Sequence, residues 1–166
     1  MTERPNGTGA QTGSRPAARP LEDLLARDGK LVYKIKGVSM EPMLRQDRDL
    51  VIIRVPASRL KKYDVALYKR GSSYVLHRVI AVREDRYLIR GDNTYVLEHV
   101  PKRNVIGIVT HILRGEKVIE MSDPAYQTYV ASLNRIYPLR KKLWQLRRSI
   151  SEMLYGLYGK VRHYTE

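Results

Sequence analysis

The sequence predicts a mainly β fold, a coiled antiparallel β-barrel or a coiled sheet, followed by an amphipathic C-terminal α-helix. Three patterns favour it: many short runs rich in Val, Ile and Tyr, polar turns between them, and helical periodicity near the C-terminus. The chain has 166 residues, which suits one domain with short extensions. We expect a disordered tail over residues 1–19, a β domain over 20–123 and a basic helical tail over 124–166.

The expected elements follow one another without a βαβ rhythm. Pro20 opens a short helix and Gly29 ends it. The apolar face of this helix consists of Leu21, Leu24 and Leu25. Strands are then expected at residues 31–36, 50–55, 64–69, 73–83, 86–90, 104–114 and 116–121.

The last expected element is an amphipathic helix over residues 138–158. Apolar side chains recur at alternating spacings of three and four, at Ile136, Leu139, Leu143, Leu146, Ile150, Met153 and Leu157. Basic flanks are formed by Arg140, Lys141, Lys142, Arg147 and Arg148, and interfacial aromatics by Trp144, Tyr155 and Tyr158. The helix either lies on an anionic membrane surface or packs on the barrel or on a second copy.

The composition excludes several kinds of chemistry and predicts where in the cell the protein is located. The absence of cysteine excludes disulfides and a thiol nucleophile. The four histidines show no metal-ligand spacing, so we expect neither a metal nor another cofactor. No apolar run approaches the ~18 residues of a membrane span, and the first 20 residues lack a signal-peptide core. We therefore expect a cytoplasmic protein, either free or held peripherally at a membrane.

The first chemically suggestive segment is residues 37–44, directly after an expected strand. A serine that leaves a strand beside a glycine can be held rigidly and still be exposed. Gly37 has no side chain to block a substrate backbone, and Pro42 fixes the chain as it leaves Ser39.

Two further segments contain groups that suit proton transfer. Strand alternation places His77 on an apolar face with Val75 and Val79, as either a core residue or a general base. The stretch 91–93 is a turn, and Asp92 within it is a candidate acceptor for the second N–H of His77.

In this order, the segments resemble the type I signal peptidases over residues 30–114. The resemblance rests on Gly37-x-Ser39-Met40-x-Pro42-x-Leu44, His77-Arg78-Val79, Gly91-Asp92-Asn93 and Ile106-Gly107-Ile108-Val109, with Asp49-Leu50-Val51 and Asp64-Val65 at strand entries. It implies a signal-peptidase-like fold, related to that of LexA-like repressors. Bacterial members and LexA-like repressors use a lysine where this chain has His77, whereas the archaeal and endoplasmic-reticulum branch uses Ser, His and Asp.

The resemblance also implies roles for individual residues. Ser39 would be the nucleophile, His77 the base and Asp92 the carboxylate that orients it. Glu98 is a secondary acidic candidate, in the stretch where relatives often have a second acidic pair. Substrate or oxyanion contacts are expected from Gly37, Ser39, Met40 and Pro42, with backbone N–H groups near Ser39 as the oxyanion donors.

The expected function is that of a serine endopeptidase that cleaves an extended peptide or precursor protein by Ser-His-Asp acyl transfer. The resemblance implies small residues on the acyl side of the cleaved bond. The alternative is a DNA-binding or membrane-associated regulator with a self-cleaving or inactive peptidase-like domain. Nucleic acid is not the expected partner, because only about 30 residues precede the first expected strand and most of them are expected to be disordered. The N-terminal transmembrane anchor of the family is not seen in this sequence.

Overall fold

The computed structural model describes residues 20–162, with side chains described through residue 152. Within that range the chain forms eight antiparallel strands and three α-helices, so the mainly β prediction is confirmed. The strands are β1 (Lys30–Lys34), β2 (Asp49–Arg54), β3 (Val65–Arg70), β4 (Ser73–Val82), β5 (Arg86–Arg90), β6 (Glu98–Pro101), β7 (Val105–Arg114) and β8 (Lys117–Glu120). The helices are α1 (Leu21–Asp28), α2 (Pro124–Arg135) and α3 (Tyr137–Arg162), with a 3₁₀ turn at Lys102–Asn104. The expected tail 1–19 and the side chains of Met153, Tyr155, Leu157 and Tyr158 lie outside the described residues.

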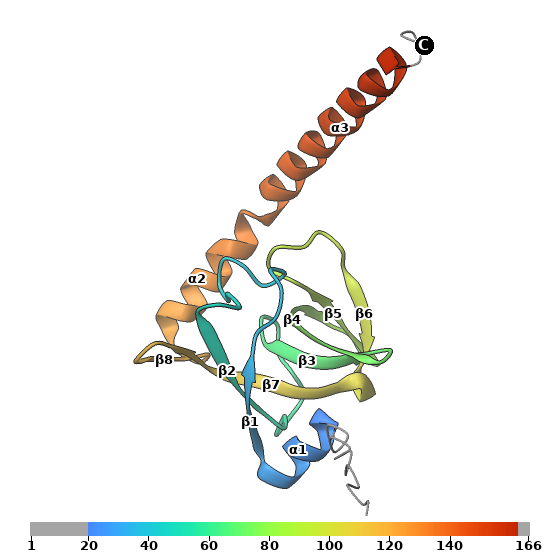
Figure 1. The fold of residues 1–166 in the computed structure, drawn as a ribbon. Helices are drawn as coiled ribbons and strands as arrows, with labels where there is room; N and C mark the ends of the chain where they lie inside the picture. The colour runs from blue at the N-terminus through green and yellow to red at the C-terminus, as the bar shows by residue number, and fades with distance from the viewer. Residues whose placement is uncertain (1–19, 163–166) are drawn as a thin grey trace, which may run out of the picture.

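The strands form a single sheet in the order β1-β2-β7-β3-β4-β5-β6, with β8 paired to β7 (Figure 1). No ladder among residues 20–162 joins β1 to β6, so the sheet is not closed into the expected barrel. Both end strands are short, and β6 ends at Pro101, which has no backbone N–H to extend a ladder. The expected strands are observed with ends displaced by at most two residues, but the sequence patterns did not predict β6.

β3 is the centre of the fold because it is buried on both faces. Val65 and Leu67 enter one apolar cluster, which also contains Leu25 of α1. Ala66 and Tyr68 enter a second cluster on the other face of the sheet. β4 pairs with β3 so that Ala66 lies opposite His77, and the pairing therefore brings His77 to the face occupied by Tyr68.

The helices have different relations to the sheet. α1 buries Leu25 and ends at Gly29, whose φ of 67° is the left-handed cap expected from the sequence. Asp123 caps the start of α2, and its carboxylate accepts hydrogen bonds from the backbone N–H groups of Ala125 and Tyr126. The helical tail expected over residues 124–166 is thus divided into α2 and α3.

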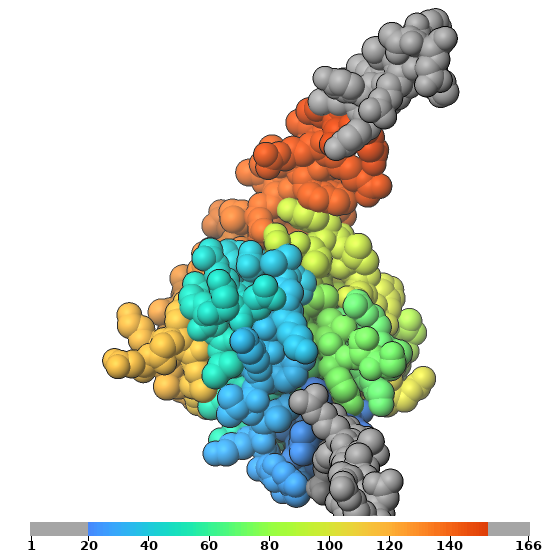
Figure 2. All heavy atoms as spheres, in the orientation of Figure 1, coloured from blue at the N-terminus to red at the C-terminus, as the bar shows by residue number. Residues whose placement is uncertain are grey.

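α3 extends away from the sheet, as Figures 1 and 2 show. Its apolar stripe begins at Ile136, the residue before the helix, and is 45% to 62% exposed at the described positions Ile136, Leu139, Leu143, Leu146 and Ile150. The possibility that this stripe packs on the sheet is therefore wrong for these residues. Among the described residues, no helix is both long enough and apolar enough to cross a membrane.

Gly107 of β7 provides a test of how tightly the first cluster is packed. A Cβ atom at this position would lie 2.4 Å from Cγ2 of Ile53, which is fully buried. We expect Gly107→Ala to lower the free energy of unfolding by about 1–3 kcal/mol, measured by urea denaturation. The control is Val118→Ala at an exposed position of β8, where the change should stay below about 0.5 kcal/mol. Equal stability of the two variants would contradict the tight contact.

Candidate active site

Ser39 lies in the loop 35–48 between β1 and β2. Gly37 begins the turn with a φ of 78°, a conformation that favours glycine, and its N–H donates to Oε1 of Gln46 at 2.9 Å. Beyond Ser39, the side chains of Met40 and Leu44 are buried in the first apolar cluster. The loop is thus held from both sides of Ser39, while Ser39 itself stays partly exposed.

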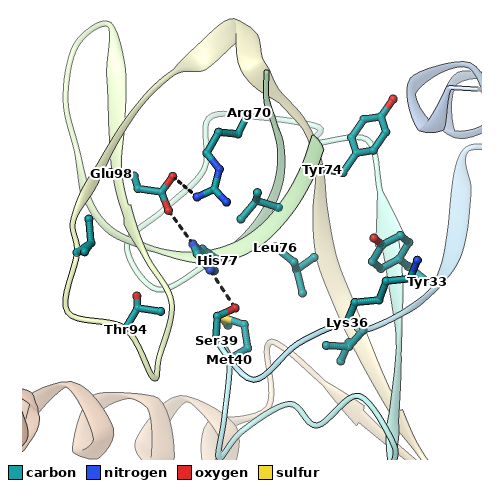
Figure 3. Close-up of a pocket in the computed structure, with 13 residues that line it drawn as sticks. Tyr33, Lys36, Ser39, Met40, Arg70, Tyr74, Leu76, His77, Thr94 and Glu98 are labelled. Atoms are coloured by element: carbon teal, nitrogen blue, oxygen red, sulfur yellow. Dashed lines mark hydrogen bonds and ion pairs between the residues drawn. The ribbon is translucent and has the colours of Figure 1, made fainter. Parts of the chain in front are cut away.

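His77 connects Ser39 to a carboxylate (Figure 3). Its Nε2 lies 3.0 Å from Oγ of Ser39, and its Nδ1 lies 3.1 Å from Oε1 of Glu98 at the start of β6. The other carboxylate oxygen of Glu98 accepts a hydrogen bond from Arg70 at 3.1 Å. The hydroxyl of Tyr68 lies 3.3 Å from Nδ1 of His77. Four side chains from three strands and one loop therefore form a connected chain, from Arg70 through Glu98 and His77 to Ser39.

The surroundings keep His77 neutral near pH 7. Burial is the main cause that lowers the pKa of His77 below its usual 6.5; Glu98 raises this pKa, and the charge of Arg70 lowers it again. When Nδ1–H donates to Glu98, Nε2 has its lone pair free to accept the Ser39 hydroxyl. Burial also raises the pKa of the Tyr68 hydroxyl, which therefore keeps its proton.

The structure corrects the position expected for Asp92. The carboxylate of Asp92 accepts hydrogen bonds from Nε of Arg78 at 2.8 Å and from Nη2 at 2.7 Å. Both side chains are at most 1% exposed. The sequence predicted that the carboxylate of Asp92 accepts a hydrogen bond from His77. In the structure it is Glu98, the secondary candidate, that hydrogen-bonds to Nδ1 of His77. The reason is that alternation along β4 turns Arg78 to the opposite face from His77, and a buried guanidinium needs a carboxylate there.

The turn 91–93 acts on the Ser39 loop through its backbone. Asn93 donates its N–H to the carbonyl of Ser39 at 2.8 Å. A Cβ atom on Gly91 would lie 2.6 Å from that same carbonyl oxygen and 3.0 Å from Nε2 of His77. The turn therefore sets the separation of Ser39 and His77, and only glycine fits this closely.

Ser39 and His77 open onto a cleft with a volume of about 610 Å³. Ile35, Met40 and Leu76 form apolar parts of its lining, whereas Lys36 and Arg70 bring positive charge. The lining thus combines a polar reaction centre with apolar contact area, as small-molecule and peptide sites commonly do.

Of the other residues expected to contact substrate, Met40 lines this cleft but Pro42 does not. Pro42 lines a second cavity of about 440 Å³ on the α2 side of the loop.

The N–H of Gly37 is occupied by Gln46, so it is not available as an oxyanion donor. Within residues 20–162, the backbone N–H groups of Ser39 and Met40 make no hydrogen bond to another residue. No group of three or more His, Asp or Glu side chains in this range is arranged to hold a metal ion.

Sequence reasoning missed Tyr68 and Arg70. Alternation along β3 puts Ala66, Tyr68 and Arg70 on one face, and His77 follows from the same rule on β4. Only the register, with Ala66 opposite His77, shows that these faces coincide.

Comparison of the sequence with models of protein families gives no match, and comparison with curated proteins gives none either. The support for a catalytic function therefore comes from the residues and contacts described above.

The two acidic residues should behave differently when their charge is removed. Asp92→Asn leaves Arg78 buried without its counter-charge, so we expect a loss of about 3–5 kcal/mol in the free energy of unfolding. Glu98→Gln changes a carboxylate in contact with the open cleft, so its loss should stay below about 1 kcal/mol. Urea denaturation of both variants is the measurement. A small loss for Asp92→Asn would contradict the structural role assigned to the ion pair with Arg78.

Proposed function

We propose that the chain is a serine endopeptidase of the signal-peptidase-like type. The observation that carries the proposal is the contact of 3.0 Å between Ser39 Oγ and His77 Nε2, with Glu98 at the other ring nitrogen. A nucleophile, a base and a group that orients the base are the elements of acyl transfer by serine. Their position at an open cleft gives a peptide access to Ser39.

The geometry supports a two-step reaction. Oγ of Ser39 attacks the peptide carbonyl carbon while Nε2 of His77 takes the hydroxyl proton. His77 then gives this proton to the leaving amine, and the acyl group stays on Ser39. A water molecule gives its proton to His77 and attacks the acyl carbon. His77 then gives this proton to Oγ of Ser39 as the acyl–oxygen bond breaks, which releases the acid product and restores both residues. In both steps Glu98 stabilises the positive charge that forms on His77.

The backbone N–H groups of Ser39 and Met40 are the proposed donors to the oxyanion. The sequence also predicted backbone N–H groups near Ser39 as the donors, and the N–H of Gly37 is not among them because it is bonded to Gln46. The substrate is proposed to extend along the segment after β1, an end strand that pairs only with β2 in the described sheet. Addition of an extended peptide to such an edge uses backbone hydrogen bonds for affinity and side-chain pockets for specificity.

The residues that line the cleft support an apolar residue on the acyl side of the cleaved bond. Met40 and Leu76 lie beside Ser39 and His77 in the cleft, and an apolar substrate side chain fits such a wall. The resemblance to signal peptidases narrows the proposal to small residues at this position. A regulator that cleaves only itself is the competing function, and intact mass after incubation of the chain alone distinguishes it.

The test of the proposed function is cleavage of a diverse peptide library, read by mass spectrometry. We expect new termini with the wild type and none with Ser39→Ala or His77→Ala, because each residue is essential to one coupled proton transfer. Glu98→Gln should lower kcat/KM by a factor of about 10³, since His77 loses the carboxylate that orients it. Circular dichroism establishes that each variant is folded. Undiminished cleavage by Ser39→Ala would overturn the proposal.

The pH profile tests His77 as the base. Because a base must be deprotonated to act, kcat/KM should rise with pH through one step, with a midpoint below 6.5 since burial lowers the pKa of His77. Arg70→Gln removes a positive charge that lowers this pKa, so the midpoint should move to higher pH. The matched control is Arg83→Gln at an exposed position after β4, which should leave the midpoint unchanged. A wild-type midpoint above pH 8 would contradict a histidine base.

A further inference from the structure

The apolar stripe of α3 is left uncovered by the described part of the chain. Five large apolar side chains along one side of the helix, from Ile136 to Ile150, are each 45% to 62% exposed. At the rise of an α-helix, they span about 21 Å. Water contact along such a length is unfavourable, and an uncovered patch of this kind marks an interaction site.

The first turns of α3 are anchored on another side of the helix. The ring of Trp144 stacks on Tyr95 with centroids 4.8 Å apart, and Arg140 donates to the carbonyl of Asp92 at 3.2 Å. The guanidinium of Arg90 lies 3.2 Å from the ring centre of Tyr137. At 100° per residue, these contact positions lie roughly a third of a turn away from the stripe. The anchored helix thus presents its stripe outward instead of turning it onto the sheet.

The charge of α3 indicates which kind of surface covers its apolar stripe. Residues 136–152 contain five Lys or Arg residues and one acidic residue, Glu152, which accepts a hydrogen bond from Arg148 at 2.7 Å. With this single acidic side chain, two copies paired through the stripe would bring mostly like charges together. An anionic bilayer surface satisfies both features, because its acyl region accepts the apolar side chains and its headgroups attract the basic ones.

We propose that α3 lies in the plane of an anionic lipid surface, with its apolar stripe inserted and its Lys and Arg side chains at the headgroups. The loop 91–97 lies beside the base of α3 (Figure 2), where Tyr95 stacks on Trp144, and it exposes Val96 and Leu97 by 71% and 43%. Val96 also lines the cleft of Ser39. Resting on the proposed function, this arrangement holds the cleft close to the bilayer, where a peptide emerging from the lipid surface reaches Ser39.

Co-sedimentation of the full chain with vesicles tests the proposal. We expect the wild type to pellet with phosphatidylcholine–phosphatidylglycerol vesicles at low salt, and to stay in the supernatant at high salt or with phosphatidylcholine alone. Leu143→Gln with Leu146→Gln, and Arg147→Glu with Arg148→Glu, should each weaken the partition by about tenfold. All four side chains are exposed, so the fold is expected to tolerate these changes.

Two controls separate this proposal from its alternatives. Lys61→Glu with Lys62→Glu makes the same change of net charge at exposed positions outside α3, and it should alter binding by less than about twofold. Ser39→Ala should bind the vesicles as the wild type does. The vesicle result therefore tests the lipid proposal independently of the peptidase proposal. Wild type that remains in the supernatant with anionic vesicles at low salt overturns the proposal. So does a dimer in sedimentation equilibrium that the Leu143 and Leu146 changes dissociate, or equal weakening by the Lys61 and Lys62 control.

Discussion

The buried ion pair between Arg78 and Asp92 is the interaction on which the candidate site depends. Besides its two bonds to Asp92, the guanidinium donates to the carbonyl of Tyr63 at 2.8 Å and to the hydroxyl of Tyr126 at 3.1 Å. One charged group therefore connects β4, the turn after β5, the entry to β3 and α2. A charge removed from water this completely is stable only when its partners are all in place. The geometry of the Ser39 loop follows, because the turn that contains Asp92 also holds the carbonyl of Ser39.

The adjacent β4 residues His77 and Arg78 have different roles: His77 belongs to the candidate site, and Arg78 belongs to the buried ion pair. His77 and Arg78 point to opposite faces of the strand, so one reaches the cleft while the other is enclosed by the core. The same division separates the two carboxylates, since Glu98 contacts the cleft and Asp92 is enclosed. A single strand thus aligns the proposed base with the ion pair that keeps its surroundings rigid, which is the usual requirement for a preorganised site.

Much of this arrangement could be predicted from local sequence patterns, and the rest depended on pairing between distant segments. Alternation located most strands, and the order of short motifs identified Ser39 and His77. The motif order also suggested Asp92 as the partner of His77, but a motif cannot show which of two nearby carboxylates a buried arginine requires. Glu98 was harder to assign because β6 is too short, and too close to Pro101, to show a strand pattern. The closed barrel was wrong for a related reason, since closure depends on contacts between the two end strands.

The projecting helix has a consequence for how the protein behaves during purification. α3 contains 26 residues, which corresponds to a rod of about 39 Å, and the contacts described between its side chains and the rest of the chain lie near its first turns. A particle of this shape diffuses more slowly than a sphere of the same 19.3 kDa mass. The protein therefore elutes earlier in gel filtration than a sphere of this mass, and its apparent mass is too high. A monomer resembles a larger assembly in that measurement. Light scattering or sedimentation equilibrium, which report mass independently of shape, are the appropriate methods for counting its subunits.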